Sequence, residues 1–249
     1  MKKFKLKRVV NISLLLILFF SIIFNFSTPK VNYEVNRINT KEKIVMLTFD
    51  DGPSLADETI LDILKENDAK ATFFGTGINY KKYWTDKKIK MIVKRIIKEG
   101  HTLGNHSYNH NNYQFKTKEG FNEFYQTSEM IAKIYQENNI EKNISVIPVR
   151  MPYLQYYRGM DYIKSKMKID YFVRGYLGCD YNESICGKNK ILKQYKRNIK
   201  PGQILVCHTR DYAKEWLPDL LLYLAENNYK TANFSSGEHY YKNYGGLIF

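Results

Sequence analysis

Cysteine is scarce in this 249-residue chain, which contains only three. The chain is 44% hydrophobic and long enough to bury a core without a disulfide framework. Cys179 and Cys186 lie seven positions apart in a polar stretch, and they either close a small disulfide loop or remain two free thiols. Cys207 lies in an apolar run, so we expect it to be buried as a small hydrophobic residue.

Acidic residues are also in deficit, because 25 Asp and Glu stand against 39 Lys and Arg, for a formal net charge of +14. About half of this excess falls within residues 1–43 and says little about the folded body. The sequence lacks a basic run with interleaved aromatic residues, which argues against a nucleic-acid partner. It also lacks internal repeats, which excludes a repeat architecture. We expect the protein to be a monomer.

One long hydrophobic run is present, over residues 9–26, directly after the basic segment "MKKFKLKR". Its length can span a bilayer, and the basic flank favours a cytoplasmic N-terminus. No A-x-A-like cleavage site follows, which favours an uncleaved signal anchor over the alternative, a cleaved signal peptide. We predict a transmembrane anchor over residues 1–26, a linker over 27–42 and a single domain over 43–249. The domain is expected outside the cytoplasm, held at the cell membrane, or secreted if the segment is cleaved.

From Lys43 onward, short apolar runs alternate with longer amphipathic segments. The apolar runs predict strands at 44–49, 71–75, 101–104, 146–150, 170–174, 203–207 and 229–233. The amphipathic segments predict helices at 55–67, 84–99, 117–138, 157–167, 187–198 and 214–227. This alternation indicates a parallel α/β fold, either a barrel or an open sheet. Polar residues cluster just after the strand ends, where such folds place their chemistry.

Two of these clusters together suggest a metal site. In "MLTFDDGPS", Asp50 and Asp51 end an apolar run, and in "GNHSYNH" His106 and His110 are four residues apart, so one turn can direct both imidazoles at one point. Two histidines and one carboxylate leave coordination positions open for water and substrate. One aspartate would then be a ligand and the other a base, and a divalent cation would keep both ionised. The alternative is an ordinary Asp-Asp turn at the surface.

Three further polar residues follow predicted strands or turns. Arg150 in "VRMPY" either faces solvent or holds a carboxylate in position. His208 ends the apolar run "ILVCH", where it is either structural or catalytic. Asp180 in "GCDY" either orients that imidazole or caps a turn.

Taken together, these motifs resemble those of the polysaccharide deacetylases of carbohydrate esterase family 4, also called the nodulation-protein-B homology domain. "TFDDGP" and "HSYNH" match the first two motifs of the family, and "RMPY", "CDY" and "VCH" resemble the third to fifth, all in the family's order. The resemblance spans residues 43–234. It implies a distorted (β/α)7-type barrel that binds one divalent metal ion, usually Zn²⁺, with Co²⁺, Mn²⁺ or Ni²⁺ as alternatives.

The resemblance also implies a role for each matching residue. Asp51, His106 and His110 would be the metal ligands, with Asp50 as the general base and Arg150 steadying it. These roles imply metal-dependent hydrolysis of N-acetyl groups on an amino-sugar polymer outside the cytoplasm, such as peptidoglycan, an exopolysaccharide or a chitin-like chain.

The remaining matches concern the acid and the groove. His208 would be the general acid and Asp180 would hold it, while the backbone N–H of Tyr153 would help to bind the oxyanion. Tyr153 and Tyr181 would also offer ring faces for sugar contacts.

Several positions depart from the family pattern. The third motif usually reads Arg-Pro-Pro-Tyr-Gly, but Met151 and Leu154 replace its second residue and its glycine. In the fourth motif Leu177 replaces a leading aspartate and Tyr181 a tryptophan, and Thr209 replaces a common aspartate after the last histidine. These departures motivate two alternatives: a metal-containing carbohydrate-binding protein without turnover, and an O-acetyl esterase of the same fold.

Overall fold

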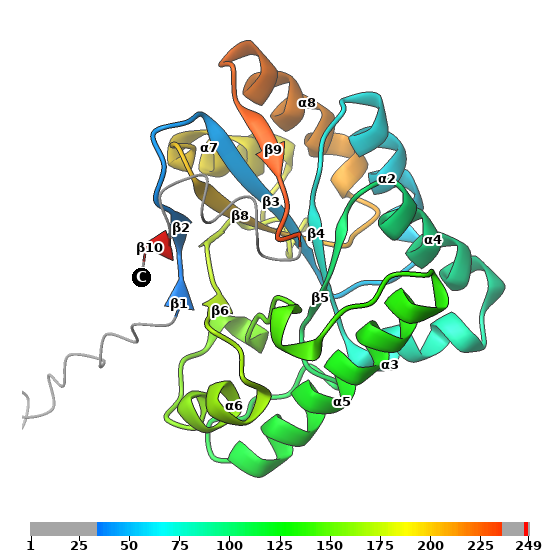
Figure 1. Cartoon of the computed structure of the whole chain (residues 1–249). Helices are drawn as coiled ribbons and strands as arrows, with labels where there is room; N and C mark the ends of the chain where they lie inside the picture. Colours follow the sequence, from blue (N-terminus) through cyan, green and yellow to red (C-terminus); the bar gives the residue numbers. More distant parts are fainter. Residues whose placement is uncertain (1–33, 236–246, 249) are drawn as a thin grey trace, which may run out of the picture. The chain divides into compact units, whose positions relative to one another are not determined.

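The computed structural model describes residues 34–235 and 247–248, and these residues form one compact unit. Its main sheet has the strand order β10-β2-β8-β3-β4-β5, with β7 paired to β8 and β9 paired to β3 (Figure 1). The pairs that β3, β4, β5, β7, β8 and β9 form among themselves are all parallel, whereas β2 pairs antiparallel with both β8 and β10. A separate parallel pair joins β1 to β6. The predicted parallel α/β fold is therefore confirmed.

The central strand is β3 (Ile44–Asp50), in which every residue is buried. Such a continuous apolar run is typical of a parallel strand covered on both faces. It lies between β8 (Gln203–His208) and β4 (Thr72–Gly75), and β4 in turn pairs with β5 (Thr102–Asn105). The register places Asp50 opposite His208, so two candidate catalytic residues end neighbouring strands at the same edge.

The helices follow the predicted segments with small shifts at their ends. They are α2 (Ala56–Glu66), α4 (Lys87–Lys98), α5 (Thr117–Glu137), α6 (Met160–Met167), α7 (Lys188–Asn198) and α8 (Ala213–Glu226), together with the short α3 (Gly77–Tyr80). In α4 the Asp86 side chain caps the first turn by accepting from the backbone N–H groups of Lys88 and Ile89. The same helix buries Ile89, Ile92, Val93 and Ile96, one face at helical spacing.

The prediction of a strand over residues 146–150 is wrong. Residues Ile144–Val146 form a short 3-10 helix, and only an isolated bridge between Val149 and Asn105 continues the sheet beyond β5. Pro148 explains the difference, because it has no N–H to donate to a ladder. In the described part of the chain the sheet is consequently an α/β half-barrel rather than a closed (β/α)7 barrel, and β6 (Phe172–Val173) pairs with β1 outside the main sheet.

Part of the predicted linker is also structured. Residues 34–38 form β1 (Glu34–Val35) and β2 (Arg37–Ile38), in which Val35 and Ile38 are fully buried. Both strands pair with the folded body, β1 with β6 and β2 with β8 and β10 (Leu247–Ile248). The remaining strands are β7 (Tyr176–Leu177) and β9 (Lys230–Ala232). The predicted anchor over residues 1–26 lies outside the described residues, and none of the helices described is long and apolar enough to cross a membrane.

Candidate active site

The candidate residues meet in one cleft at the carboxyl ends of the parallel strands. Its volume is about 340 Å³. Asp50 ends β3, His208 ends β8, and His106 directly follows β5. The described residues that line it are Asp50, Asp51, His106, His110, Tyr153, Leu154, Leu177, Tyr181, Val206, His208 and Arg210.

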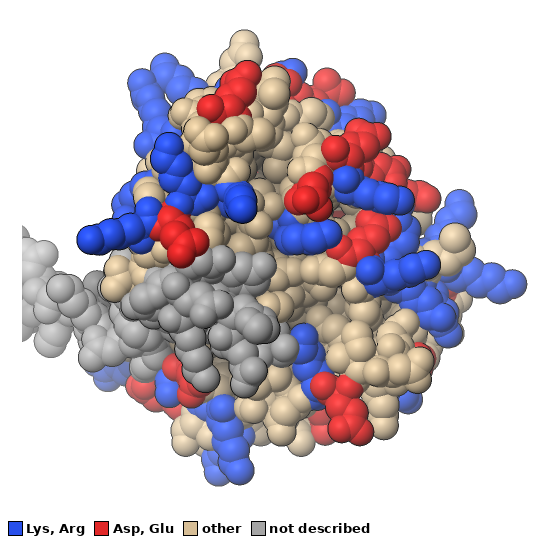
Figure 2. Space-filling view, turned by 45° about the horizontal axis from the view of Figure 1, so that its top comes forward, with Lys and Arg blue, Asp and Glu red and all other residues tan. Residues whose placement is uncertain are grey.

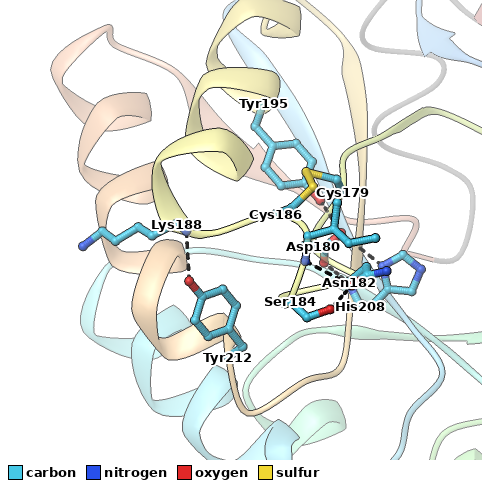
Figure 3. Close-up of a disulfide and its surroundings, with 10 residues drawn as sticks. Cys179, Asp180, Asn182, Ser184, Cys186, Lys188, Tyr195, His208 and Tyr212 are labelled. Carbon is cyan, nitrogen blue, oxygen red and sulfur yellow. Dashed lines mark hydrogen bonds and ion pairs between the residues drawn. A yellow bond between two sulfur atoms is a disulfide. The ribbon is translucent and has the colours of Figure 1, made fainter.

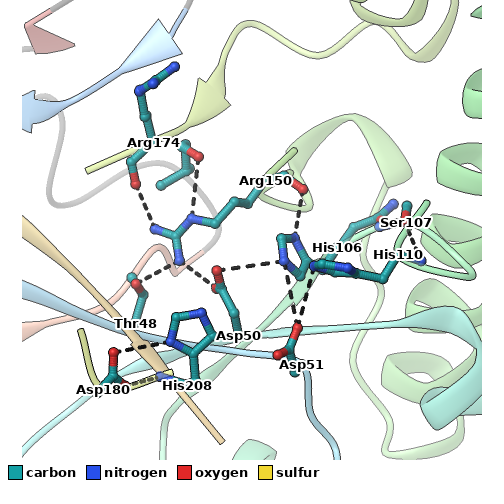
Figure 4. Close-up of polar contacts among 12 residues, drawn as sticks. Thr48, Asp50, Asp51, His106, Ser107, His110, Arg150, Arg174, Asp180 and His208 are labelled. Atoms are coloured by element: carbon teal, nitrogen blue, oxygen red, sulfur yellow. Dashed lines mark hydrogen bonds and ion pairs between the residues drawn. The ribbon is translucent and has the colours of Figure 1, made fainter. Parts of the chain in front are cut away.

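Asp51, His106 and His110 form a compact group of candidate metal ligands (Figure 4). Their ligand atoms all lie within 4.8 Å of one another. The Oδ1 atom of Asp51 is 3.9 Å from Nε2 of His106 and 3.6 Å from Nε2 of His110. Ligands at about 2.0–2.2 Å from one tetrahedral ion lie roughly 3.3–3.6 Å apart, and the two distances from Asp51 to the histidines are close to this spacing. Two imidazole nitrogens and one carboxylate oxygen are donors that suit Zn²⁺ and neighbouring transition metals.

The two histidines are held with their Nε2 atoms toward this point. His106 is 2% exposed, and its Nδ1 is 2.9 Å from the carbonyl oxygen of Arg150, which favours the tautomer with the proton on Nδ1 and a free lone pair on Nε2. The His110 N–H donates to the Ser107 hydroxyl at 3.1 Å, and burial followed by the proximity of His106 lowers the His110 pKa. A neutral imidazole is the form that binds a metal ion.

Glu123 of helix α5 holds the loop that carries His106 and His110. Its carboxylate accepts from the Asn109 N–H at 2.8 Å and from the hydroxyl of Tyr113. The Tyr113 and Ser107 hydroxyl oxygens are also hydrogen-bonded, 3.0 Å apart, with Ser107 as the donor because the single Tyr113 proton goes to Glu123. The loop that carries both candidate ligands is therefore tied to a long helix by side-chain hydrogen bonds rather than by strand pairing.

Asp50 lies beside the ligand group, with its Oδ2 3.6 Å from Nε2 of His106, and its other oxygen is paired with Arg150. Its Oδ1 accepts from Nη1 of Arg150 at 2.6 Å, and the same nitrogen is 2.7 Å from the Thr48 hydroxyl. Burial by itself raises the pKa of Asp50, but the charge and hydrogen bond of Arg150, with the charges of His106 and His208, lower it overall. The carboxylate is consequently ionised and able to accept a proton.

Arg150 is fully buried, which rules out the alternative that it faces solvent. Its Nη2 donates to the carbonyl of Arg174 at 2.8 Å, and its guanidinium lies 4.2 Å from the ring centroid of Phe74 (Figure 4). A buried charge is tolerable only when it is paired and hydrogen-bonded, and these contacts satisfy that condition. The guanidinium therefore fixes the orientation of the Asp50 carboxylate.

His208 is held by Asp180 on the other side of the cleft. Asp180 accepts from the His208 backbone N–H at 2.7 Å, and its Oδ1 is 3.1 Å from Nδ1 of the same residue. The Tyr195 hydroxyl donates to Asp180 at 2.8 Å. Burial lowers the His208 pKa, but the hydrogen bond and charge of Asp180, together with the other nearby carboxylates, raise it overall. The imidazole is therefore suited to carry a proton that it can donate through Nε2.

Two exposed tyrosines flank the cleft. The Tyr153 ring is 61% exposed and lies 4.6 Å from the His110 ring, while the Tyr181 ring is 53% exposed and lies 5.8 Å from the His208 ring. Both Tyr153 and Leu154 have left-handed backbones, with φ of 58° and 50°. Leu154 thus takes, without the glycine usual in the family, a conformation that favours glycine.

Sequence reasoning missed several contributors. Arg210 lines the cleft, and its Nη2 donates to Oδ2 of Asp51 at 2.9 Å. Thr48 and Tyr195 bond to Arg150 and Asp180 respectively, and neither stood out because each lies in an apolar run or a helix. Of the alternatives for Cys179 and Cys186, the structure has the disulfide, which lies beside Asp180 (Figure 3). Cys207 is buried and free, as predicted.

The fold and the site together define an α/β protein with a two-histidine, one-aspartate group at its strand ends. The sequence model of the family described as polysaccharide deacetylase matches residues 37–172, more than half of the chain. The chain therefore belongs to the polysaccharide deacetylase family, the NodB homology domain of carbohydrate esterase family 4.

Curated relatives agree with this family. A peptidoglycan-N-acetylglucosamine deacetylase of Bacillus cereus is 43% identical over 101 residues, which are 40% of this chain and 35% of that protein. The chain thus spans about a third of that relative's length. The peptidoglycan-N-acetylmuramic acid deacetylase PdaA of Bacillus subtilis is 28% identical over 197 residues, which are 77% of this chain and 70% of that protein.

Solved structures of the family share the fold. A mutant of a CE4 family pseudoenzyme with restored enzymatic activity has a TM-score of 0.68 and 25% identity, covering 81% of this chain and 70% of that one. Because the fold is shared by a pseudoenzyme, evidence for activity has to come from the site itself.

Proposed function

We propose that this protein removes N-acetyl groups from an amino-sugar polymer by metal-dependent hydrolysis. One observation carries the proposal: a buried, ionised carboxylate, Asp50, lies beside a candidate metal group but is paired with Arg150. A proton donor, His208, lies in the same cleft with its own carboxylate partner. A base and an acid next to an open metal site are the parts that amide hydrolysis requires.

Asp51, His106 and His110 would hold the metal ion, which we expect to be Zn²⁺. Bound there, the ion would polarise the acetyl carbonyl and lower the pKa of a water molecule. The residues fit such an ion, as their spacing and the Nδ1 contact of His106 indicate.

The protein's own groups would perform the proton transfers. Asp50 takes a proton from the attacking water, and Arg150 keeps that carboxylate ionised and oriented until then. Tyr153 lines the cleft, and its backbone N–H would help to bind the negative charge that grows on the carbonyl oxygen. His208 then donates its proton to the departing amine, which is a very poor leaving group without it, and Asp180 stabilises the imidazolium. The products would be acetate and a sugar with a free amine.

We propose peptidoglycan as the first substrate to test, since two relatives are named for activity on it. This substrate agrees with the proposed anchor over residues 1–26 and a domain outside the cytoplasm. Tyr153 and Tyr181 would stack against sugar rings at the mouth of the cleft.

The test is acetate release from N-acetylglucosamine oligomers and from peptidoglycan, with the full chain loaded with Zn²⁺. We expect release by the wild type and a loss of about 100-fold or more in kcat for Asp50→Asn, since general base catalysis contributes roughly 10²–10⁴. Metal content measured on the same samples should be unchanged in Asp50→Asn. If the wild type binds metal and glycan but releases no acetate, the protein is a binding protein without turnover and the proposal is wrong.

A further inference from the structure

We propose that Arg210 recognises a carboxylate on the glycan, so that the cleft prefers N-acetylated sugars that carry an anionic group or lie beside one. This inference rests on the proposed deacetylation and defines the substrate class of the same site. It concerns a residue that the proposed reaction does not use.

The first support is the position of Arg210. It lies two residues after His208, and its Nη2 donates to Oδ2 of Asp51 at 2.9 Å. Its side chain is nevertheless 47% exposed. A guanidinium carries five N–H donors in a planar fork, and this contact uses one of them. The ion pair thus holds a permanent cation at the mouth of the cleft with donors left for a ligand.

The second support is the distribution of charge in the cleft. Among the described residues that line the cleft, Arg210 is the single Lys or Arg. Asp50 is already compensated by the buried Arg150. A divalent cation on Asp51 would draw that carboxylate's charge away from Arg210, leaving the guanidinium without a full counter-charge. An anion on the substrate would restore the balance, and guanidinium binds carboxylates through two parallel hydrogen bonds.

The third support is a second cavity beside the first. Its volume is about 410 Å³, and both cavities are lined by Arg210 and Tyr181. A polymer that continues from the metal site into this cavity passes both residues, so a sugar stacked on Tyr181 brings its substituents to Arg210. Glu183 and Asp211 also line the second cavity and would repel a carboxylate farther in, which leaves Arg210 as the point of recognition.

The charge of the body agrees with an anionic polymer. Residues 44–249 contain 30 Lys and Arg against 23 Asp and Glu. Lys and Arg side chains are spread over the face shown in Figure 2, with Asp and Glu between them. A positive surface attracts a polyanion at long range, whereas Arg210 would select the anionic group at the site.

The experiment compares two forms of one polymer. The first is peptidoglycan glycan strands stripped of peptides, whose lactyl ether groups end in free carboxylates. The second is the same strands after methyl esterification, which removes the charge and adds one methyl group to each carboxylate. The readout is the ratio of kcat/KM on the free strands to kcat/KM on the esterified strands. This ratio cancels any change in metal occupancy that follows from the contact with Asp51.

We expect the wild type to prefer the free carboxylates, and Arg210→Gln to lower the ratio about 10- to 100-fold, as for loss of a charged hydrogen bond. Arg210→Lys keeps the charge without the fork and should lie between them. Arg158→Gln is the matched control, since Arg158 is exposed and does not line the cleft, and its ratio should equal the wild-type ratio. A wild-type ratio near one, or an equal ratio in Arg210→Gln, overturns the inference.

Measuring the affinity for the two polymers tests this inference independently of the proposed reaction. If the wild type releases acetate from neither polymer, the proposed function fails, and calorimetric affinities of wild type and Arg210→Gln for both polymers decide about Arg210. A preference for the free strands that Arg210→Gln loses supports the inference without turnover. Equal affinities of the wild type for both polymers overturn it.

Discussion

At the scale of single residues, Asp57 shows how the turn after Asp51 is tied to the loop after His208. It is fully buried at the start of α2, accepts from the Ser54 N–H at 2.8 Å and accepts from the Thr209 hydroxyl at 2.8 Å. The side chains of Asp57 and Thr209 also pack against Gly52, where an added Cβ would lie 2.9 Å from Asp57 and 3.1 Å from Thr209. One carboxylate thereby joins the segment after Asp51 to the segment after His208.

Asp57 should make stability depend on pH. Burial raises its pKa from 3.8 to about 7, so the folded state holds a proton that the unfolded chain has already lost. The stability that Asp57 contributes is then fully present below pH 3.8 and is lost as pH rises through about 7. We expect the free energy of unfolding of the wild type relative to Asp57→Asn to fall between pH 4 and pH 8, measured by urea denaturation.

Thr209 supplies the control for this prediction. Thr209→Val keeps the shape but removes the hydroxyl that stabilises the ionised carboxylate, so it should raise the pKa of Asp57 further and make the total fall in stability with pH larger than in the wild type. Thr209→Ser should behave as the wild type does. A difference between wild type and Asp57→Asn that does not vary with pH would show that Asp57 keeps an ordinary pKa.

Leu154 gives a second prediction at this scale. Its φ of 50° is unfavourable for a side chain with a Cβ, by about 1–2 kcal/mol for each left-handed residue. Leu154→Gly relieves this strain but raises the entropy of the unfolded chain, whereas Leu154→Ala loses the same apolar contacts and keeps the strain. We expect Leu154→Gly to be more stable than Leu154→Ala by about 1 kcal/mol in urea denaturation. Equal stability of the two variants would mean that the position is unstrained in solution.

At the scale of elements, the fold was largely predictable because its strands are short, apolar and bounded by polar turns. Ile44–Asp50 and Gln203–His208 follow that pattern almost to the residue. The failure at residues 146–150 has a local cause in Pro148. Residues 34–38 were missed because two-residue strands have no detectable period, and their partners lie far away in the sequence.

The candidate site likewise contains residues that were predictable from the sequence and one that was not. Asp51, His106 and His110 were predictable because both motifs are local and follow strands. Arg210 was not, since its importance comes from a contact with Asp51 that spans 159 positions. A sequence motif within one segment cannot predict this contact, because the two residues follow different strands that become neighbours only in the folded sheet.

The disulfide loop is the element at which we predict an effect on the proposed reaction. Cys179 and Cys186 close a loop that begins with Asp180 and Tyr181, directly beside the hydrogen bond to His208 (Figure 3). The bond limits the freedom of the segment that positions the acid. We expect the double variant Cys179→Ser/Cys186→Ser to lower kcat several-fold while metal content stays unchanged.

Reductant should reproduce this effect in the wild type and have no effect on the double variant. Cys207→Ala is the control, because Cys207 is buried outside the disulfide, and this variant should keep the wild-type sensitivity to reductant. An equal kcat for the wild type and the double variant would show that Asp180 is held by Tyr195 and His208 alone.

At the scale of the whole molecule, the site is assembled from separate segments that only the folded state brings together. Asp51 follows β3, whereas His106 and His110 follow β5, with β4 between the two strands. An ion held by all three residues binds the folded chain far better than the unfolded one, so it must stabilise the entire domain.

Removing the metal ion should therefore lower the melting temperature of the full chain. At a free concentration of 100 times Kd, one bound ion contributes about 2.7 kcal/mol, and for a domain of this size that is roughly 5–11 °C. We expect chelation to remove this increment in a thermal unfolding scan and Zn²⁺ to restore it. Asp51→Asn should lose the response to Zn²⁺. Asp50→Asn has the same change in charge one residue earlier and should keep the response, because Arg150 rather than the ion holds that carboxylate. Loss of the response in both variants would make Asp50 a ligand and leave the cleft without a free base.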